Sequence, residues 1–212
     1  MLNIVVMASG GGTNLQALID AIEAGRIKNG RIAGVVSTKP EAYALVRAEK
    51  HNIPYIVFER KKYNDLSLFD RDVYNYLQSV SADLIVLAGF LTIFGELITE
   101  TYRNKIINIH PALIPSFCGK GFYGLRVHQA VLDYGVKLTG STVHFADETV
   151  DGGAIILQKA IEVLDDDTPE SLQQRVMTEC EQVILPQAVN LFCEDRLKIE
   201  DRRVRVLPNR LT

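Results

Sequence analysis

Short runs of β-branched and other apolar residues alternate with amphipathic segments along the first 90 residues of the chain. Strands are predicted at residues 3–7, 32–37, 55–58 and 84–90, and helices at 15–25, 40–52 and about 68–80. Strands separated by helix-length segments form βαβ units, which build a parallel sheet with helices on both faces. The carboxyl ends of such strands meet along one edge, where ligands bind. The alternation therefore predicts an α/β fold with its site at that edge.

The second half of the chain continues the pattern with fewer helices. The predicted elements are strands at 105–110, 139–145 and 154–163, a glycine-rich loop at 116–125, and a helix at 127–135. Thr168 as N-cap, followed by Pro169, predicts the start of a long helix, which Pro186 would kink or divide. The alternating segment 197–207 is typical of a surface hairpin with Asp201 and Arg202 at its turn.

Length, charge and cysteine content exclude several classes of protein. The chain has 212 residues, enough for a single domain with a sizeable core, and its net charge of −3 does not favour nucleic acid as a partner. No apolar stretch approaches the ~20 residues that span a bilayer, and the N-terminus lacks the pattern of a secretory signal. Three cysteines without CxxC spacing favour reduced thiols over disulfides or zinc. We therefore expect a cytoplasmic protein without membrane contact.

The glycine-rich stretch at residues 9–14, SGGGTN, follows the first strand and opens onto the first helix. Backbone N–H groups and a helix N-terminus at such a turn can bind an anion. The stretch lacks the helix-positioned glycine of the dinucleotide fingerprint and the lysine of a Walker A loop. These absences favour a small phosphoester over NAD or ATP. A tight turn in which Thr13 only caps the helix is the alternative.

Asn108 and His110 stand two positions apart in the otherwise apolar strand that precedes Pro111. Side chains at positions i and i+2 of a strand point to the same face, so this pair would project together. At the carboxyl end of a strand, an amide and an imidazole can polarise a carbonyl group and hold an oxyanion. A hydrogen-bonded core histidine beside a loop-capping asparagine explains the same residues equally well.

The acidic loop at 144–153, HFADETVDGG, supplies three carboxylates, and one of them near His110 would raise the pKa of that imidazole. Most acidic loops are merely solvated, which is the alternative here. Cys118 could pair with His110 as a nucleophile, but a free loop thiol is the simpler interpretation. His128 and His144 lack a second ligand at metal spacing, and His51 suits a surface or capping position.

The segments SGGGTNLQALI, LAGFLTIF, NIHPALIPSF, GSTVHF and DETVDGGAIILQ occur in the order seen in the phosphoribosylglycinamide formyltransferase family. The resemblance runs from Asn3 to about Val206, and the combination is specific although no single segment is. It implies a Rossmann-like formyltransferase fold, a mostly parallel twisted sheet in a single domain at 1–212. Residues 1–100 would form the phosphate-binding half and 101–212 the folate and catalytic half. Members transfer a formyl group from 10-formyltetrahydrofolate to the amine of glycinamide ribonucleotide in purine synthesis.

The resemblance also implies roles for individual residues. Asn108, His110 and Asp151 match the catalytic trio, and His144 matches a supporting histidine. Glu181 matches the acid that contacts the glycinamide end of the substrate. Residues that match the phosphate site are Gly12, Thr13 and Asn14, and those that match the folate site are Leu91, Thr92, Ile93, Phe94, Asn108, Ala146 and Asp147. The family's chemistry requires neither a metal ion nor a covalent intermediate, and a protonated His110 would donate to the formyl oxygen.

The chain departs from the family pattern at four places. Thr92 stands where some members carry arginine, and Leu66 replaces a folate-side arginine, for which Arg60, Lys61 or Lys62 could substitute. The loop CGKGFYG replaces a shorter one, and the helix around Cys180 requires a one-residue gap, which bears on Glu181. The resemblance leaves open whether the protein is a monomer or a weak homodimer.

Four other functions fit part of the pattern. An initiator-tRNA formyltransferase would need a further C-terminal domain and a basic face, and a formyltetrahydrofolate hydrolase would carry an extra N-terminal domain. A module that only binds phosphometabolites would need the glycine-rich stretch but not the trio Asn108, His110 and Asp151, which this chain carries. A Rossmann oxidoreductase would need the missing glycine and an acid where Ser37, Thr38 and Lys39 stand.

Overall fold

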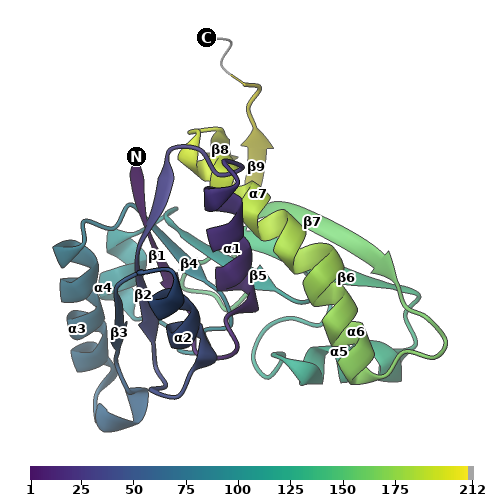
Figure 1. Ribbon diagram of the computed structural model, residues 1–212. Helices are drawn as coiled ribbons and strands as arrows, with labels where there is room; N and C mark the ends of the chain where they lie inside the picture. The colour runs from purple at the N-terminus through teal and green to yellow at the C-terminus, as the bar shows by residue number, and fades with distance from the viewer. Residues whose placement is uncertain (210–212) are drawn as a thin grey trace.

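The computed structural model describes residues 1–209 and contains one nine-stranded sheet flanked by helices (Figure 1). Its strands are β1 (Leu2–Met7), β2 (Gly30–Ser37), β3 (Tyr55–Val57), β4 (Leu84–Leu87), β5 (Ile106–His110), β6 (Leu138–Phe145), β7 (Ile155–Glu162), β8 (Leu197–Glu200) and β9 (Arg203–Val206). The helices are α1 (Thr13–Glu23), α2 (Tyr43–Lys50), α3 (Leu66–Ser79), α4 (Glu96–Thr101), α5 (Leu125–Tyr134), α6 (Pro169–Val176) and α7 (Gln182–Cys193), with a 3₁₀ turn η1 (Arg60–Lys62) and a π-helical turn η2 (Met177–Glu181). Every predicted strand and helix is confirmed, whereas α4 escaped prediction because its six residues are too few for a periodic pattern.

The strand order β3-β2-β1-β4-β5-β6-β7-β9-β8 confirms a mostly parallel sheet. The five strands from β3 to β5 are parallel to their neighbours. β2 and β3 lie on one side of β1, whereas β4 and β5 lie on its other side, so the direction in which strands are added to the sheet reverses between β1 and β4. Such a reversal opens a crevice above the carboxyl ends of the strands. β6 then pairs with β5 in the antiparallel sense, and so does β7 with β6. The second half of the sheet therefore folds back toward the crevice.

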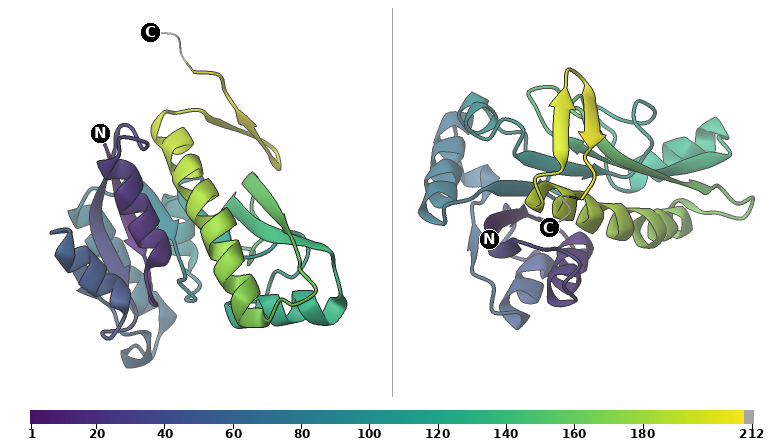
Figure 2. Two further views of the ribbon diagram at one scale, coloured as in Figure 1. Left: turned by 45° about the vertical axis from the view of Figure 1, so that its right-hand side comes forward. Right: turned by 90° about the horizontal axis from the view of Figure 1, so that it is seen from above.

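Strand β1 alternates its side chains between the two faces of the sheet, as a strand buried on both sides must. Ile4 and Val6 join a cluster with α1, α2 and α7, whereas Val5 and Met7 join a second cluster with α3 and α4. Figure 2 shows α1 and α7 side by side over one face of the sheet. Both faces are therefore covered by helices, as predicted.

The helical segment from Pro169 to Cys193 is continuous but contains the π-helical turn η2. The sequence predicts that Pro186 kinks or divides this helix, but the division lies at Met177–Glu181 and Pro186 is inside α7. A π turn holds one more residue than an α-helical turn. The extra residue seen around Cys180 is therefore taken up without breaking the helix.

The C-terminal segment forms the predicted hairpin. β8 and β9 pair in the antiparallel sense, and the pair Glu200 and Arg203 leaves Asp201 and Arg202 at the turn. A single bridge between Ile155 and Arg203 joins the hairpin to β7. Over residues 1–209, no helix has the length and apolar character needed to cross a membrane.

The start of α6 provides a test of the predicted cap. The Thr168 hydroxyl accepts a hydrogen bond from the backbone N–H of Ser171 at 3.2 Å, and Ser171 Oγ accepts one from the N–H of Thr168 at 2.9 Å. We expect Thr168→Ala to lower the free energy of unfolding by about 1 kcal/mol, because one N–H group loses its partner. Thr168→Ser retains the hydroxyl and should keep most of that stability. Urea unfolding of both variants measures the difference, and equal losses would contradict the role of the hydroxyl.

Candidate active site

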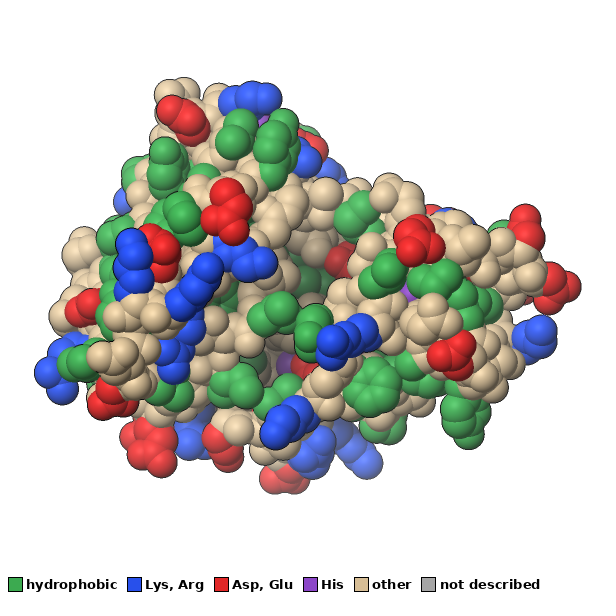
Figure 3. Space-filling model, turned by 90° about the horizontal axis from the view of Figure 1, so that it is seen from below, with side chains coloured by type: hydrophobic (Ala, Val, Ile, Leu, Met, Phe, Trp, Pro, Cys, Tyr) green, Lys and Arg blue, Asp and Glu red, His purple; other side chains and the backbone are tan. Residues whose placement is uncertain are grey.

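A cavity of about 790 Å³ opens at the carboxyl ends of β1, β4 and β5. Figure 3 shows it as a hollow in one face of the molecule, with histidine and acidic side chains inside and basic side chains nearby. Every site residue predicted from the sequence lines it: Gly12, Thr13, Asn14, Leu91, Thr92, Ile93, Phe94, Asn108, His110, His144, Ala146, Asp147, Asp151 and Glu181. The fold therefore brings segments from both halves of the chain into one site.

The glycine turn forms one end of the cavity and leads directly into α1. Gly12 has φ of 70°, and a β-carbon on it would lie 2.7 Å from Ala44 Cα, so the position requires glycine. The carbonyl groups of Gly10 and Gly11 accept hydrogen bonds from Ala44 N and Arg47 Nε. The alternative in which Thr13 caps the helix is wrong, because Gly12 is the N-cap and Thr13 Oγ1 donates to Met177 Sδ at 3.1 Å. The N–H groups of the first turn thus remain for an anion.

Glu181 lies beside this turn because of the π-helical segment η2. Its Oε2 accepts a hydrogen bond of 2.6 Å from Asn14 Nδ2, and burial raises the pKa of Glu181 while this bond opposes the change. Asn14 Oδ1 is buried without a hydrogen-bond partner among the described protein atoms. A buried acceptor without a partner costs about 1–3 kcal/mol, which a donor on a bound ligand would recover. Asn14 and Glu181 therefore form a polar contact point next to the free N–H groups at the start of α1.

Asn108 and His110 lie on one face of β5, and Ile107 and Ile109 pack into the cluster on the opposite face. This placement confirms the alternation predicted from the sequence. The antiparallel register pairs Asn108 with His144, and Asn108 Nδ2 lies 3.0 Å from His144 Nε2. His144 Nδ1 lies 2.8 Å from the carbonyl oxygen of Phe145, which assigns the proton to Nδ1 and makes Nε2 an acceptor. One N–H of the Asn108 amide is then left for a substrate.

Asp151 connects the acidic loop to both histidines. Its carboxylate oxygens lie 3.6 Å from His110 Nδ1 and 3.7 Å from His144 Nε2, and Oδ2 accepts a 2.8 Å hydrogen bond from Gly119 N. Burial favours a higher pKa for Asp151, but the imidazoles and the Gly119 N–H outweigh it and hold the pKa below its ordinary value. Asp151 is therefore ionised at neutral pH, and the alternative of a merely solvated loop is wrong for this residue, which is mostly buried.

The protonation of His110 differs from the expectation. The sequence predicts that a nearby carboxylate raises the pKa of this imidazole, but burial dominates and lowers the pKa of His110 below 6.5. Asp151 and the carbonyl oxygen of Phe117, 2.9 Å from His110 Nε2, oppose the decrease without reversing it. The free protein thus holds a mainly neutral His110 at pH 7, with acceptors facing both ring nitrogens.

The segment between β4 and α4 forms an apolar wall of the cavity. Phe90 and Phe94 stack with ring centroids 5.4 Å apart, whereas Leu91 and Ile93 remain more than half exposed. The N–H of Gly95 donates a 2.5 Å hydrogen bond to the buried carboxylate of Asp70. Exposed apolar side chains on an anchored loop are suited to bind a flat, partly apolar ligand.

Several other predicted candidates do not contribute chemistry. Cys118 donates a hydrogen bond to the Pro115 carbonyl, and burial and Asp151 raise the pKa of its thiol, so it is not an activated nucleophile. His51 ends α2 and lies 2.9 Å from Glu23, as expected of a capping residue. Leu66, which stands in place of the folate-side arginine, packs against the apolar cluster formed by β1, α3 and α4. The basic turn at 60–62, the suggested substitute, does not line the cavity. Among residues 1–209, no group of His, Cys, Asp and Glu side chains is arranged to hold a metal ion.

Three features escaped prediction: the Phe117 carbonyl, the Gly119 N–H and the burial of His128, for which the sequence offered only a weak metal-ligand interpretation. The first two are backbone groups, which no pattern of side chains reveals. His128 is fully buried on α5, and both of its ring nitrogens lack a hydrogen-bond partner among the described protein atoms. Val127 and Val131 are buried on the apolar face of α5, and the position of His128 places it on the same face. This helical spacing is the signal in the sequence that could have indicated the burial of His128.

The chain is similar to known formyl transferases over nearly its whole length. The model of the formyl transferase family matches residues 2–189. The phosphoribosylglycinamide formyltransferase of Haemophilus influenzae is 42% identical over 201 residues, which cover 95% of this chain and 92% of that protein. The enzyme of the same name from Escherichia coli is 34% identical over 200 residues, with 94% and 91% covered.

Solved structures show the same similarity. Glycinamide ribonucleotide transformylase 1 from Symbiobacterium toebii superposes with a TM-score of 0.92 at 42% identity, covering 98% of this chain and 95% of that one. A formyltetrahydrofolate deformylase from Pseudomonas syringae superposes with a TM-score of 0.86 at 27% identity, covering 98% of this chain and 66% of that one. The fold is therefore common to transfer and hydrolysis of a formyl group.

The buried His128 should make stability depend on pH. Burial, with a smaller effect of His110, lowers the pKa of His128 to about 4, whereas an imidazole in an unfolded chain has a pKa of about 6.5. The unfolded state therefore binds a proton first, so we expect stability to be full above pH 6.5 and to fall as the pH decreases toward 4. The decrease from this residue should approach about 3 kcal/mol, since one pKa unit corresponds to about 1.4 kcal/mol.

Urea unfolding at several pH values between 4 and 8 tests this expectation. His128→Phe keeps an aromatic ring but cannot take up a proton, so its stability should decrease less over this range than that of the wild type. The comparison of slopes is independent of any change in stability at pH 8. Parallel curves for the two proteins would contradict the assignment to His128.

Proposed function

The chain belongs to the formyl transferase family, and we propose that it transfers the formyl group of 10-formyltetrahydrofolate to the amine of N1-(5-phosphoribosyl)glycinamide. The products are the formylglycinamide ribonucleotide and tetrahydrofolate, and the step belongs to purine synthesis. The observation that carries the proposal is the placement of Asn108, His110 and Asp151 in one cavity with an anion-binding turn. That cavity offers a phosphate site, an apolar wall and an oxyanion site together.

The ribonucleotide binds at the end of the cavity formed by the glycine turn. Gly12, Thr13 and Asn14 present backbone N–H groups and the N-terminus of α1 to its phosphate. Glu181 lies beside Asn14, so its carboxylate accepts hydrogen bonds from the part of the substrate that leads to the glycinamide end. This arrangement directs the amine along the cavity toward His110.

The folate co-substrate occupies the other part of the cavity. Leu91, Thr92, Ile93 and Phe94 supply a partly exposed apolar wall for its pterin ring. Further contacts come from Asn108 and from the loop residues Ala146 and Asp147, which line the same space. The formyl group would then lie beside Asn108 and His110.

The reaction follows from these positions. The amine nitrogen attacks the formyl carbon, and the carbonyl electrons move to the oxygen, which becomes an oxyanion. Asn108 donates the N–H that His144 does not use. His110 donates a second hydrogen bond from Nε2, where the formyl oxygen takes the place of the Phe117 carbonyl oxygen that faces this nitrogen in the free protein. When the carbonyl forms again, the bond from carbon to N10 of the folate breaks. The proton lost by the attacking nitrogen passes through water held by Asp151 and ends on N10.

His110 can donate in either protonation state. A neutral imidazole carries one N–H, and developing negative charge on the formyl oxygen raises its affinity for a second proton. The ionised Asp151, 3.6 Å from Nδ1, favours the charged form at that stage. His144 holds the Asn108 amide in place and acts as a supporting residue.

A single domain over 1–212 accounts for this site, with the phosphate turn in residues 1–100 and the catalytic trio in 101–212. The two small molecules are its partners, and the proposed chemistry uses no metal ion, nucleic acid or membrane. We expect the protein to act in the cytoplasm, in keeping with three free cysteines. The protein would act as a monomer or weak homodimer.

Formyl transfer with and without the ribonucleotide tests the proposed function. We expect tetrahydrofolate to appear, followed by absorbance, only when glycinamide ribonucleotide is present. Equal release in its absence would make the protein a hydrolase like the deformylase from Pseudomonas syringae. No release of tetrahydrofolate under either condition would indicate a module that binds phosphometabolites without catalysing transfer.

His110→Ala should reduce kcat by about 100-fold or more, because the oxyanion loses one donor. Binding of the ribonucleotide, measured by calorimetry, and the far-UV spectrum should stay unchanged, since the phosphate contacts lie elsewhere. A correctly folded variant with wild-type turnover would exclude this role of His110.

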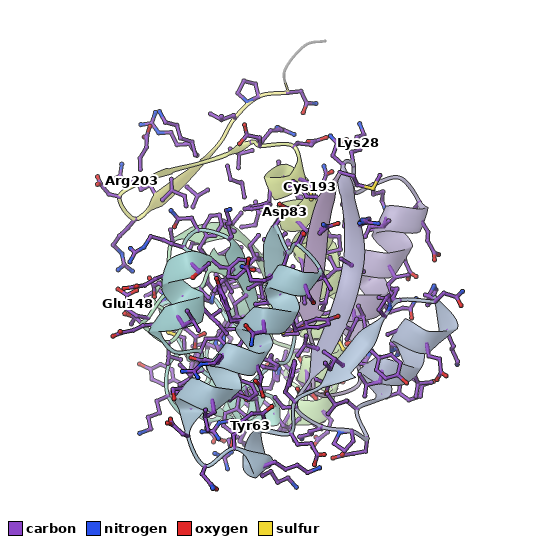
Figure 4. The ribbon with its side chains drawn as sticks, turned by 90° about the vertical axis from the view of Figure 1, so that its left-hand side faces the viewer. Lys28, Tyr63, Asp83, Glu148, Cys193 and Arg203 are labelled. Carbon is purple, nitrogen blue, oxygen red and sulfur yellow. The ribbon has the colours of Figure 1, made fainter. Side chains whose placement is uncertain are left out.

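Asp151→Asn should lower activity by about 100-fold, because the water that relays the proton loses the carboxylate that holds it. It should also move to lower pH the limb of the profile of kcat/KM against pH that reports protonation of His110. The reason is that Asp151 raises the pKa of His110 against burial, so its removal lowers that pKa further. Glu148→Gln, on the same loop (Figure 4), is the control that should leave the limb in place. A limb that does not move would assign it to another group.

A further inference from the structure

The lining of the cavity contains few positive charges for the ligands that it must hold. Both substrates of the proposed reaction are anions, since the ribonucleotide ends in a phosphate and the folate ends in a glutamate with two carboxylates. Among the described residues that line the cavity, four are acidic: Asp147, Glu148, Asp151 and Glu181. Within the same set, Lys120 is the only lysine or arginine.

The phosphate has a binding site without a lysine. The glycine turn supplies N–H groups and the N-terminus of α1, an 11-residue helix, at one end of the cavity. The glutamate carboxylates have no comparable site in the described lining. Free carboxylates bind best to a cation that is not already paired. Lys120 forms no ion pair with another described residue.

The backbone next to Lys120 is anchored to the acidic loop, which also carries two of the proposed folate contacts. The N–H of Gly119 donates a 2.8 Å hydrogen bond to Asp151, which belongs to the same loop as Ala146 and Asp147. The Lys120 side chain itself is exposed, so it is free to contact a ligand that extends out of the cavity.

Aromatic side chains follow Lys120 directly. Phe122 and Tyr123 also line the cavity, and Phe122 packs against Phe117 with an edge-on geometry and centroids 6.4 Å apart. The tail of a folate consists of a benzoyl ring followed by the glutamate. An aromatic pair next to a lysine matches that order, because one binds the ring and the other the carboxylates.

We propose that Lys120 binds the glutamate carboxylates of the folate co-substrate and is a specificity-determining residue for the tail. The inference rests on the proposed function. The basic turn η1 is the competing place for the tail, since it carries Arg60, Lys61 and Lys62. Arg60 donates to the Tyr63 carbonyl and Lys62 pairs with Glu59. Tyr63 directly follows this turn and precedes the start of α3. In Figure 4 it lies well apart from Glu148, which lines the cavity.

The test compares two formyl donors in the wild type, Lys120→Met, Lys120→Arg and the control Lys61→Met. One donor is 10-formyltetrahydrofolate, and the other is 10-formyltetrahydropteroate, which lacks the glutamate. We expect Lys120→Met to raise KM for the complete donor about fivefold, the scale of one partly exposed ion pair. KM for the donor without glutamate, KM for the ribonucleotide and kcat should stay within a factor of two. Lys120→Arg should have a KM for the complete donor close to that of the wild type, because arginine keeps the positive charge. Lys61→Met should behave as the wild type with both donors.

Three results would overturn the inference. An unchanged KM for the complete donor in Lys120→Met would show that Lys120 does not bind the glutamate. An increase of this KM in Lys61→Met alone would assign the glutamate to the η1 turn instead. An increase in KM for the ribonucleotide instead would assign the lysine to the phosphate. Failure of the proposed function is distinct, because the wild type would then show no transfer that depends on the ribonucleotide.

Discussion

The antiparallel pairing of β6 with β5 is the constraint on which the proposed catalytic arrangement depends. A parallel strand in that place would not set His144 opposite Asn108, and a shift of one residue would turn the histidine to the other face of the sheet. The same register sets Thr142 opposite His110, where its hydroxyl bonds the backbone of Ala112 and Ile114. The strand pair therefore fixes the side chains of the proposed catalytic site and the course of the chain directly after β5. It also brings the loop that carries Asp151 back over the carboxyl edge of the parallel strands.

Burial and charge act in opposite directions in this site. Desolvation lowers the pKa of His110 and would raise that of Asp151, yet the neighbouring imidazoles and the Gly119 N–H keep Asp151 ionised. The result is a fixed negative charge beside a mainly neutral imidazole. In the proposed reaction such a pair would respond to the developing oxyanion, because added negative charge favours protonation of the ring. The 116–125 loop takes part through the Phe117 carbonyl and the Gly119 N–H, so the site depends on backbone groups as well as on side chains.

The strands and helices were predictable because their hydrophobic patterns are local. Alternating apolar runs gave the strands of the sheet, and Thr168 with Pro169 gave the start of α6. The position of the irregular turn in the long helix was not predictable from Pro186, because proline is tolerated inside α7 while the extra residue is absorbed at Met177–Glu181. The protonation of His110 was also beyond the sequence. It depends on how much water the surrounding elements exclude, which no spacing of residues reports.

The sequence by itself determined the class of fold, the face of β5 on which Asn108 and His110 lie, and the glycine turn before α1. These features follow from periodicity, from the allowed conformations of glycine and from the orphan N–H groups of a helix start, all of which are local. The tertiary structure alone decided that Asp151 reaches both histidines, that Glu181 lies beside Asn14, and that Lys120 is the only lysine or arginine among the described residues lining the cavity. His110 and Asp151 are 41 residues apart in the chain, and Asn14 and Glu181 are 167 apart. Strand register and helix packing bring these segments together, and no local pattern reports such long-range contacts.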